Sequence, residues 1–199
     1  THHVAKLSAN AKGLHDTYGN VWEFVWDAKE NRVDTQTTTK HAAHGGSIMD
    51  PAARSNPPGT EFVNRRGASP LVGFRVVRGT GAKPPTGPVA GYPKWVIDAK
   101  SAPSPLPKPK NIVSEADFIA VKDGGFLRDD DANVTVTDFK MLKTEVPFKL
   151  WNAVRAWAVT NGYDFDHDGD MGGMDWNSHK GAPHGPDEPV TDIGWTDAR

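Results

Sequence analysis

An aspartate-rich segment near the end of the chain has the residue types and spacing of a cation site. Side-chain oxygens stand at positions 1, 3, 5 and 12 of a twelve-residue loop, on Asp164, Asp166, Asp168 and Asp175. Gly169 permits a sharp bend at position 6, and Asp170 holds position 7, which normally offers a backbone carbonyl. Ca²⁺ prefers about six to eight such oxygens. Because four aspartates within seven residues repel one another, the loop predicts bound calcium over magnesium or a solvated acidic surface.

A second pair of acids, Asp16 and Glu23, flanks the dipeptide Gly19-Asn20. Glycine and asparagine favour tight turns, which can point backbone carbonyls inward. From these residues alone, the segment predicts a turn whose acids bond backbone amides.

Other candidates for chemistry are weak. The 199 residues contain no cysteine, which excludes disulfides, thiolate metal sites and cysteine nucleophiles within them. His41 and His44 are three residues apart in an apparent loop, and His179 and His184 stand in a Gly/Pro-rich stretch. Both pairs are more typical of incidental histidines than of zinc ligands. No phosphate loop, Ser-His-Asp order or nucleophile elbow is present.

The overall charge excludes some partners. With 23 basic and 25 acidic residues, the net charge of −2 indicates no nucleic-acid partner. The sequence has no apolar run long enough to predict a membrane span.

The elements that must position these residues are short. Alternation over residues 134–139 predicts a strand. Pro147 is suited to the first position of a helix and Gly162 to the position after its end. Between them, an apolar face is predicted from Leu150, Val154, Trp157 and Ala158.

Three segments of the first part resemble, in order, the C-terminal half of the formylglycine-generating enzyme (sulfatase-modifying factor) family. They are residues 13–27, 45–47 (GGS) and 73–78 (GFRVVR). Three later segments, residues 118–126, 139–146 and 189–198, resemble the N-terminal half of the same family. The resemblance implies an α+β, loop-rich, C-type-lectin-like fold with short twisted antiparallel strands and few helices.

The order of these segments predicts the domain organisation. Residues 1–79 are expected to be the C-terminal half of one such domain, and 115–199 the N-terminal half of a second or permuted one. Residues 80–114 are rich in proline and predict a semi-rigid linker. Either the chain is part of a longer tandem protein, or it is a permuted module. Because each half lacks strands that the other resembles, we expect the halves to pair within one chain or between copies.

The resemblance also assigns site residues. It implies a calcium site with side-chain oxygens from Asp16 and Glu23 and carbonyls from Gly19 and Val21. The family's two copper-binding cysteines would fall on Asp50 and Ser55, neither of which supplies a thiolate.

The resulting functional expectation is a non-catalytic, calcium-stabilised binding or structural module. Residues 50–70, with Arg54, Asn56, Arg65 and Arg66, lie where such folds vary their ligand contacts, and a protein or carbohydrate ligand is expected. Affinity suited to millimolar calcium would favour an extracellular or periplasmic location. The alternative is part of an enzyme, of the sulfatase-maturation or non-haem iron sulfoxide synthase group, whose catalytic residues lie outside this sequence.

Overall fold

The fold is α+β, rich in loops and short strands, as the sequence predicted; the C-type-lectin-like arrangement stays a prediction. The computed structural model describes residues 1–33, 36–51, 59–64, 67–79, 112–127, 133–172 and 185–198. The described elements are, in order, β1 (Trp22–Val33), β2 (Gln36–His44), β3 (Thr60–Asn64), β4 (Val72–Gly73), β5 (Val77–Gly79), the 3₁₀ helix η1 (Glu115–Asp117), β6 (Phe118–Val121), β7 (Gly124–Leu127), β8 (Asn133–Val136), β9 (Phe139–Leu142), α3 (Phe148–Thr160), β10 (Asp170–Met171) and β11 (Val190–Thr191).

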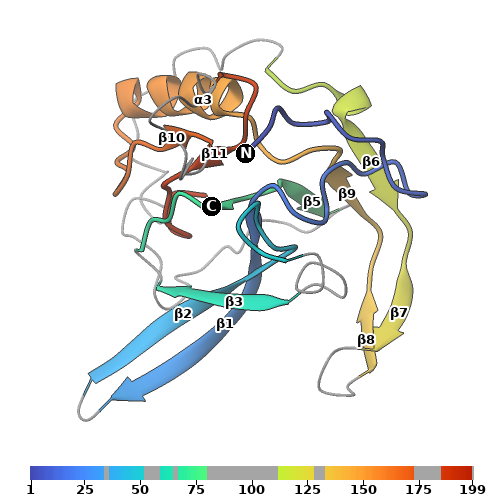
Figure 1. Ribbon diagram of the computed structural model, residues 1–199, viewed down its shortest axis with the longest axis horizontal. Coiled ribbons are helices and arrows are strands. Elements are labelled where there is room, and N and C mark those ends of the chain that lie inside the picture. Colours follow the sequence, from blue (N-terminus) through green and yellow to red (C-terminus); the bar gives the residue numbers. More distant parts are fainter. Residues whose placement is uncertain are drawn as a thin grey trace.

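The described strands form four small sheets. The largest has the order β3-β2-β1-β4, in which β1 and β2 are an antiparallel hairpin and β4 lies parallel to the start of β1. The β1–β2 hairpin extends away from the rest of the molecule, as does the smaller β7–β8 hairpin (Figure 1). The remaining sheets are β5-β9-β6 and β10-β11.

Helix α3 has the ends that the sequence predicted, within one residue. Pro147 is the N-cap with extended backbone, so the helix starts one residue later than expected. Gly162 has φ of +84° immediately after the C-cap, the left-handed conformation that glycine tolerates at helix ends.

The buried face of α3 differs from the predicted one. Trp151 and Ala158 are buried, whereas Val154 is 41% exposed. The reason is that Trp151 fills the space between Phe74 and Phe165 edge-on, which turns Val154 outward. The single strand expected over residues 134–139 is divided into β8 and β9 by residues 137–138.

The two parts of the chain share one sheet and one core. Strand β5 of the first part pairs with β9 of the second, which pairs with β6. Phe74 and Val76 pack against a buried cluster from the second part that consists of Leu142, Val146, Trp151, Val190 and Ile193. A smaller core of Trp22, Ala43 and Val72 lies in the largest sheet. The described residues of both parts therefore fold against each other within one chain.

Two further predictions concern the linker and a membrane span. Most of the proposed linker, residues 80–111, lies outside the described residues. Among the described residues, no helix is long and apolar enough to cross a membrane.

Candidate functional site

A buried arginine connects the turn at Asp16–Glu23 to the second part of the chain. Arg75 donates two hydrogen bonds to the Glu23 carboxylate, from Nε at 2.9 Å and from Nη2 at 2.6 Å. Its guanidinium also donates to the carbonyl oxygens of His15, Leu142 and Lys143. Arg75, two residues after the end of β4, therefore contacts both parts of the chain.

Asp16 has one satisfied and one unsatisfied carboxylate oxygen. Its backbone is in the left-handed region, with φ of +53°, and the residue is only 7% exposed. Oδ2 accepts the backbone N–H of Ala5 at 2.7 Å, whereas Glu23 binds a guanidinium and not the backbone amide expected from the residues alone. Oδ1 has no hydrogen-bond partner among the described residues, and His2 Nε2 lies 4.0 Å from it.

Glu145 is a third acid at this place, and the sequence analysis missed it. The residue is fully buried; Oε1 accepts from Asn20 Nδ2 at 3.0 Å, while Oε2 has no partner in the described structure. Burial raises the pKa of Glu145 to about 8, and the negative charges of Glu23 and Asp16 add to the effect. The available signal was a single acid between the apolar positions Leu142 and Val146.

We call Asp16, Glu23 and Glu145 the acidic cluster. Its three carboxylates face one guanidinium, so two negative charges are unbalanced when all are ionised. Because the pKa of Glu145 is about 8, this acid is protonated at neutral pH, and one negative charge is then unbalanced. The two buried oxygens without donors are the feature that a cation held by oxygens would satisfy. Gly19, with φ of +84°, and the fully buried Val21 belong to the turn between the first two acids.

The acidic cluster does not have the arrangement of a metal site in this structure. Within the described ranges, no three histidine, aspartate or glutamate side chains are placed to hold one ion. Arg75 occupies both oxygens of Glu23, so a cation would have to draw Asp16 and Glu145 together and share Glu23 with Arg75.

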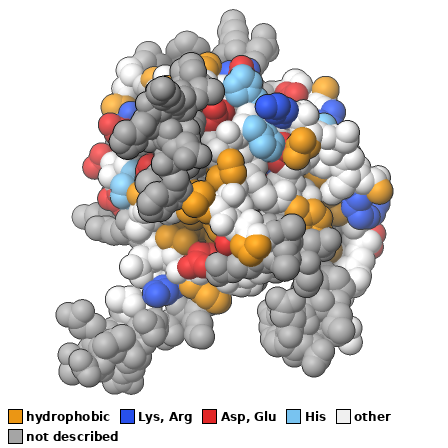
Figure 2. Space-filling model, viewed as in Figure 1, with side chains coloured by type: hydrophobic (Ala, Val, Ile, Leu, Met, Phe, Trp, Pro, Cys, Tyr) orange, Lys and Arg blue, Asp and Glu red, His pale blue; other side chains and the backbone are white. Residues whose placement is uncertain are grey.

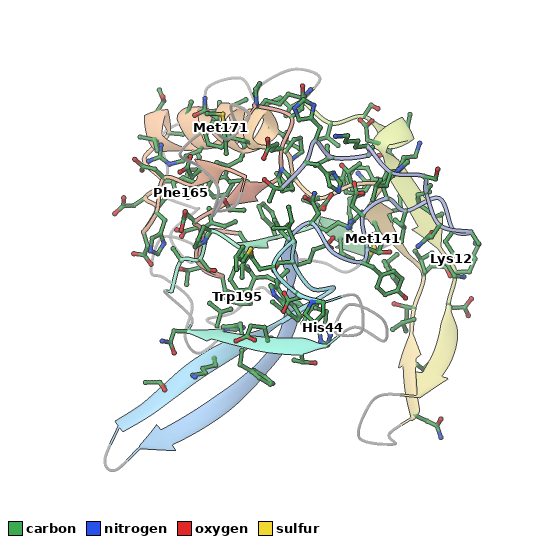
Figure 3. The ribbon with its side chains drawn as sticks, in the orientation of Figure 1. Lys12, His44, Met141, Phe165, Met171 and Trp195 are labelled. Carbon is green, nitrogen blue, oxygen red and sulfur yellow. The ribbon has the colours of Figure 1, made fainter. Side chains whose placement is uncertain are left out.

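The aspartate-rich loop lies on the surface beside α3. Gly169 has φ of +78°, as its predicted bend requires, and Trp151 Nε1 donates to the Asp168 carbonyl at 2.7 Å. Arg155 of α3 forms an ion pair with the Asp168 carboxylate. Asp164, Asp166, Asp168 and Asp170 are exposed, and Asp175 lies outside the described residues, so the loop's predicted calcium site stays a prediction. Figure 3 labels two residues of this loop, Phe165 and Met171, and one residue of the C-terminal segment, Trp195.

A histidine–aspartate pair anchors this loop and was not predicted. His167 Nδ1 lies 2.8 Å from Asp197 Oδ2, and the buried Asp197 also accepts the backbone N–H groups of Asp166 and Gly194. These contacts tie the loop to the C-terminal turn at 194–198.

The turn after β2 is the place where the resemblance put a cysteine. Gly45 and Gly46 have φ of +102° and +79°. The backbone N–H and Oγ of Ser47 both donate to Asp50 Oδ2, at 2.9 and 2.7 Å, so Asp50 closes this turn. Ser55, Arg54, Asn56, Arg65 and Arg66 lie outside the described residues.

His41 and His44 lie in strand β2, not in the loop that the sequence suggested. His41 is buried in β2 and stacks on Trp195 at 3.7 Å, a packing role. His44 lies at the end of β2 (Figure 3). His179 and His184 lie outside the described residues.

Comparison with known proteins agrees with the resemblance for the first part of the chain. No curated protein and no solved structure matches. Residues 1–80 match the family model of the sulfatase-modifying factor enzyme 1-like domain. The segment that carries the Asp16–Glu23 turn, the Ser47–Asp50 turn and Arg75 is therefore similar to a sulfatase-modifying factor enzyme 1-like domain.

Proposed function

We propose that the chain is a non-catalytic binding or structural module of the sulfatase-modifying-factor type, stabilised by calcium. The observation that carries the proposal is the acidic cluster, whose unbalanced charge and two unpartnered oxygens lie where both parts of the chain meet. A bound divalent cation would satisfy both features.

The residues that would hold calcium there are Asp16, Glu23 and Glu145, with carbonyls of Gly19 and Val21. The ion would supply positive charge and oxygen coordination only. Asn20 would orient Glu145 through the 3.0 Å bond to Oε1, and Arg75 would hold Glu23 in place through its two hydrogen bonds. The second proposed ion would be held by the aspartate-rich loop, through Asp164, Asp166, Asp168 and Asp175 and the carbonyl of Asp170.

The absence of catalysis is proposed from composition and from Asp50. The family's oxygen chemistry depends on two thiolates, and these 199 residues contain no cysteine. Asp50 instead accepts two hydrogen bonds from Ser47, a structural role.

A binding role is supported by exposed apolar side chains near this turn. Tyr18, Ile48 and Met49 are each about half exposed. Hydrogen bonds from Gly19 N to Gly45 O and from Ile48 N to Asn20 O hold their two segments side by side. Such a group beside a variable loop suits a protein or carbohydrate ligand, and a calcium requirement suits an extracellular or periplasmic site.

The test is calcium binding by titration calorimetry together with thermal unfolding in calcium and in chelator. Calcium should raise the melting temperature by mass action, and Asp16→Asn or Glu145→Gln should remove most of the increase. Asp138→Asn is the matched control, because Asp138 is an acid paired with Lys122 away from the cluster. Unchanged melting and no binding heat would refute calcium stabilisation. The chain can also be incubated with copper, oxygen and a cysteine-containing peptide, and the product followed by mass spectrometry. Conversion of the cysteine to formylglycine would refute the non-catalytic role.

A further inference from the structure

The two parts of the chain are joined by backbone hydrogen bonds. The N–H groups of Leu142 and Val146 in the second part donate to the carbonyls of Val76 and Phe74 in the first, at 2.9 and 3.0 Å. Strand β5 of the first part is the edge strand of a sheet whose other strands, β9 and β6, belong to the second part. Where one chain adds a strand to the sheet of another, main-chain bonds of this kind provide affinity and side-chain contacts provide selectivity.

The side chains beside these bonds make the contact selective. Phe74 and Val76 pack against the buried cluster of the second part, and the Phe74 ring meets Trp151 edge-on with centroids 5.9 Å apart. At Gly73 the two parts approach so closely that a Cβ would lie 2.7 Å from the Val190 carbonyl oxygen. Only a surface of matching shape fits against the first part at such distances.

Polar groups across the same contact add to its selectivity. Arg75 donates to the carbonyls of Leu142 and Lys143, and Asn20 donates to the buried Glu145. A partner without these carbonyls would leave N–H groups of Arg75 buried and unpaired, which is costly. The first part therefore recognises the second through polar as well as apolar groups.

The contacts named above all lie outside residues 80–111, the segment that joins the two parts in the sequence. They would be the same if the two parts came from two copies of the chain, as in domain swapping. Fully extended, residues 80–111 would span up to about 100 Å. The length of this segment therefore allows a second part to reach a neighbouring copy.

We propose that the surface formed by Gly73, Phe74, Arg75 and Val76 is a docking surface for the second part of another copy of this chain. Two copies then exchange residues 112–198, and each completes the core of the other. A chain's own second part has an effective concentration on the order of millimolar. The exchange therefore competes where copies are held together at such concentrations, or where a chain's own second part cannot dock. The inference goes beyond the proposed function and does not depend on calcium.

The test is complementation between two full-length variants in chelator. Arg75→Asp damages the docking surface, because it places a carboxylate against Glu23 and removes the donor to Leu142. Val146→Asp damages the second part, because it puts a charge into the shared core. Neither variant can close correctly on itself. When the two are unfolded together in urea and refolded by dilution, each pair of chains should form one intact unit from its two undamaged parts.

The expected result is a dimer by size-exclusion chromatography with light scattering. A cooperative thermal transition should appear that neither variant shows alone, with about half the wild-type amplitude per chain, since one unit in two is intact. The matched control is Arg75→Asp refolded with Phe74→Asp. Both changes lie in the first part, so this mixture should give neither the dimer nor the transition.

The outcomes decide the proposal. A complementing mixture that behaves as the sum of its separate variants would overturn it, as would an equal dimer in the control mixture. Should either variant fold alone as a stable monomer, wild-type chains with and without an isotope label are refolded together at a concentration on the order of millimolar. Native mass spectrometry should then find dimers of mixed mass, and monomers alone would overturn the exchange. Either failure leaves the proposed calcium stabilisation standing.

Discussion

Arg75 and Glu23 form a two-bond ion pair in which Nε and Nη2 of the guanidinium contact the two oxygens of one carboxylate, at 2.9 and 2.6 Å. The guanidinium side chain is 3% exposed, and its remaining N–H groups bind carbonyls from both parts of the chain. One side chain therefore links the turn before β1 with the end of β9. On the face drawn in Figure 2, the hydrophobic, acidic and basic side chains of the described residues are interspersed.

Replacing this arginine should destabilise the whole fold. Arg75→Ala leaves a partly buried carboxylate without its partner and several carbonyls without a donor, so the free energy of unfolding should fall by ~3–5 kcal/mol. Arg78→Ala removes an exposed pair with Glu115 and should cost less than about 1 kcal/mol. Urea unfolding of both variants measures the difference. Similar losses in the two variants would contradict the linking role of Arg75.

Stability without calcium should depend on the protonation of Glu145. Burial raises the pKa of Glu145 from 4.5 to about 8, so between these values the folded protein holds a proton that the unfolded chain releases. The contribution of Glu145 to the free energy of unfolding is therefore complete below pH 4.5 and is lost as the pH rises through 8. In chelator, urea unfolding should show a free energy that falls from pH 5 to 9.

The matched variant for this prediction is Glu145→Gln, which keeps the shape and cannot ionise. Its free energy of unfolding should fall less steeply over the same pH range. A variant whose slope equals that of the wild type would show that another group causes the pH dependence.

Gly169 should resist substitution for two separable reasons. It has φ of +78°, and a Cβ there would lie 2.7 Å from Trp151 Nε1 and 2.9 Å from Val190 Cγ2. Gly169→Ala should therefore cost ~2–5 kcal/mol, the sum of backbone strain and overpacking. Gly162→Ala has a similar φ but open space around it, so it should cost only ~1–2 kcal/mol. Thermal or urea unfolding of the pair isolates the packing contribution, and equal costs would disprove it.

Calcium binding at the aspartate-rich loop should discriminate between neighbouring aspartates. Asp168→Asn should weaken binding more than Asp170→Asn, because position 7 of such loops contributes a backbone carbonyl. Arg155→Gln removes the ion pair to Asp168 while keeping its carboxylate, so it should leave calcium affinity unchanged or raise it. Titration calorimetry compares the three variants. A larger effect of Asp170→Asn would exclude this ligand assignment.

The sequence by itself determined the local features. Pro147 and Gly162 mark the two ends of α3 because proline lacks the N–H that a helix interior needs and glycine tolerates a positive φ. The bend at Gly169 was also predicted from residue type and spacing, and the similarity of residues 1–80 to the sulfatase-modifying factor domain was recognised from their motifs.

Only the tertiary structure decided which distant groups meet. Glu145 lies near Asp16 and Glu23 because β9 pairs with β5, and Arg75 binds the turn that follows β9. No periodicity of the sequence encodes a contact between residues so far apart in the chain. The outward position of Val154 and the pairing of His167 with Asp197 likewise depend on what packs against each element. Local propensity fixes where an element begins and ends, whereas burial and charge balance depend on the partner that the fold supplies.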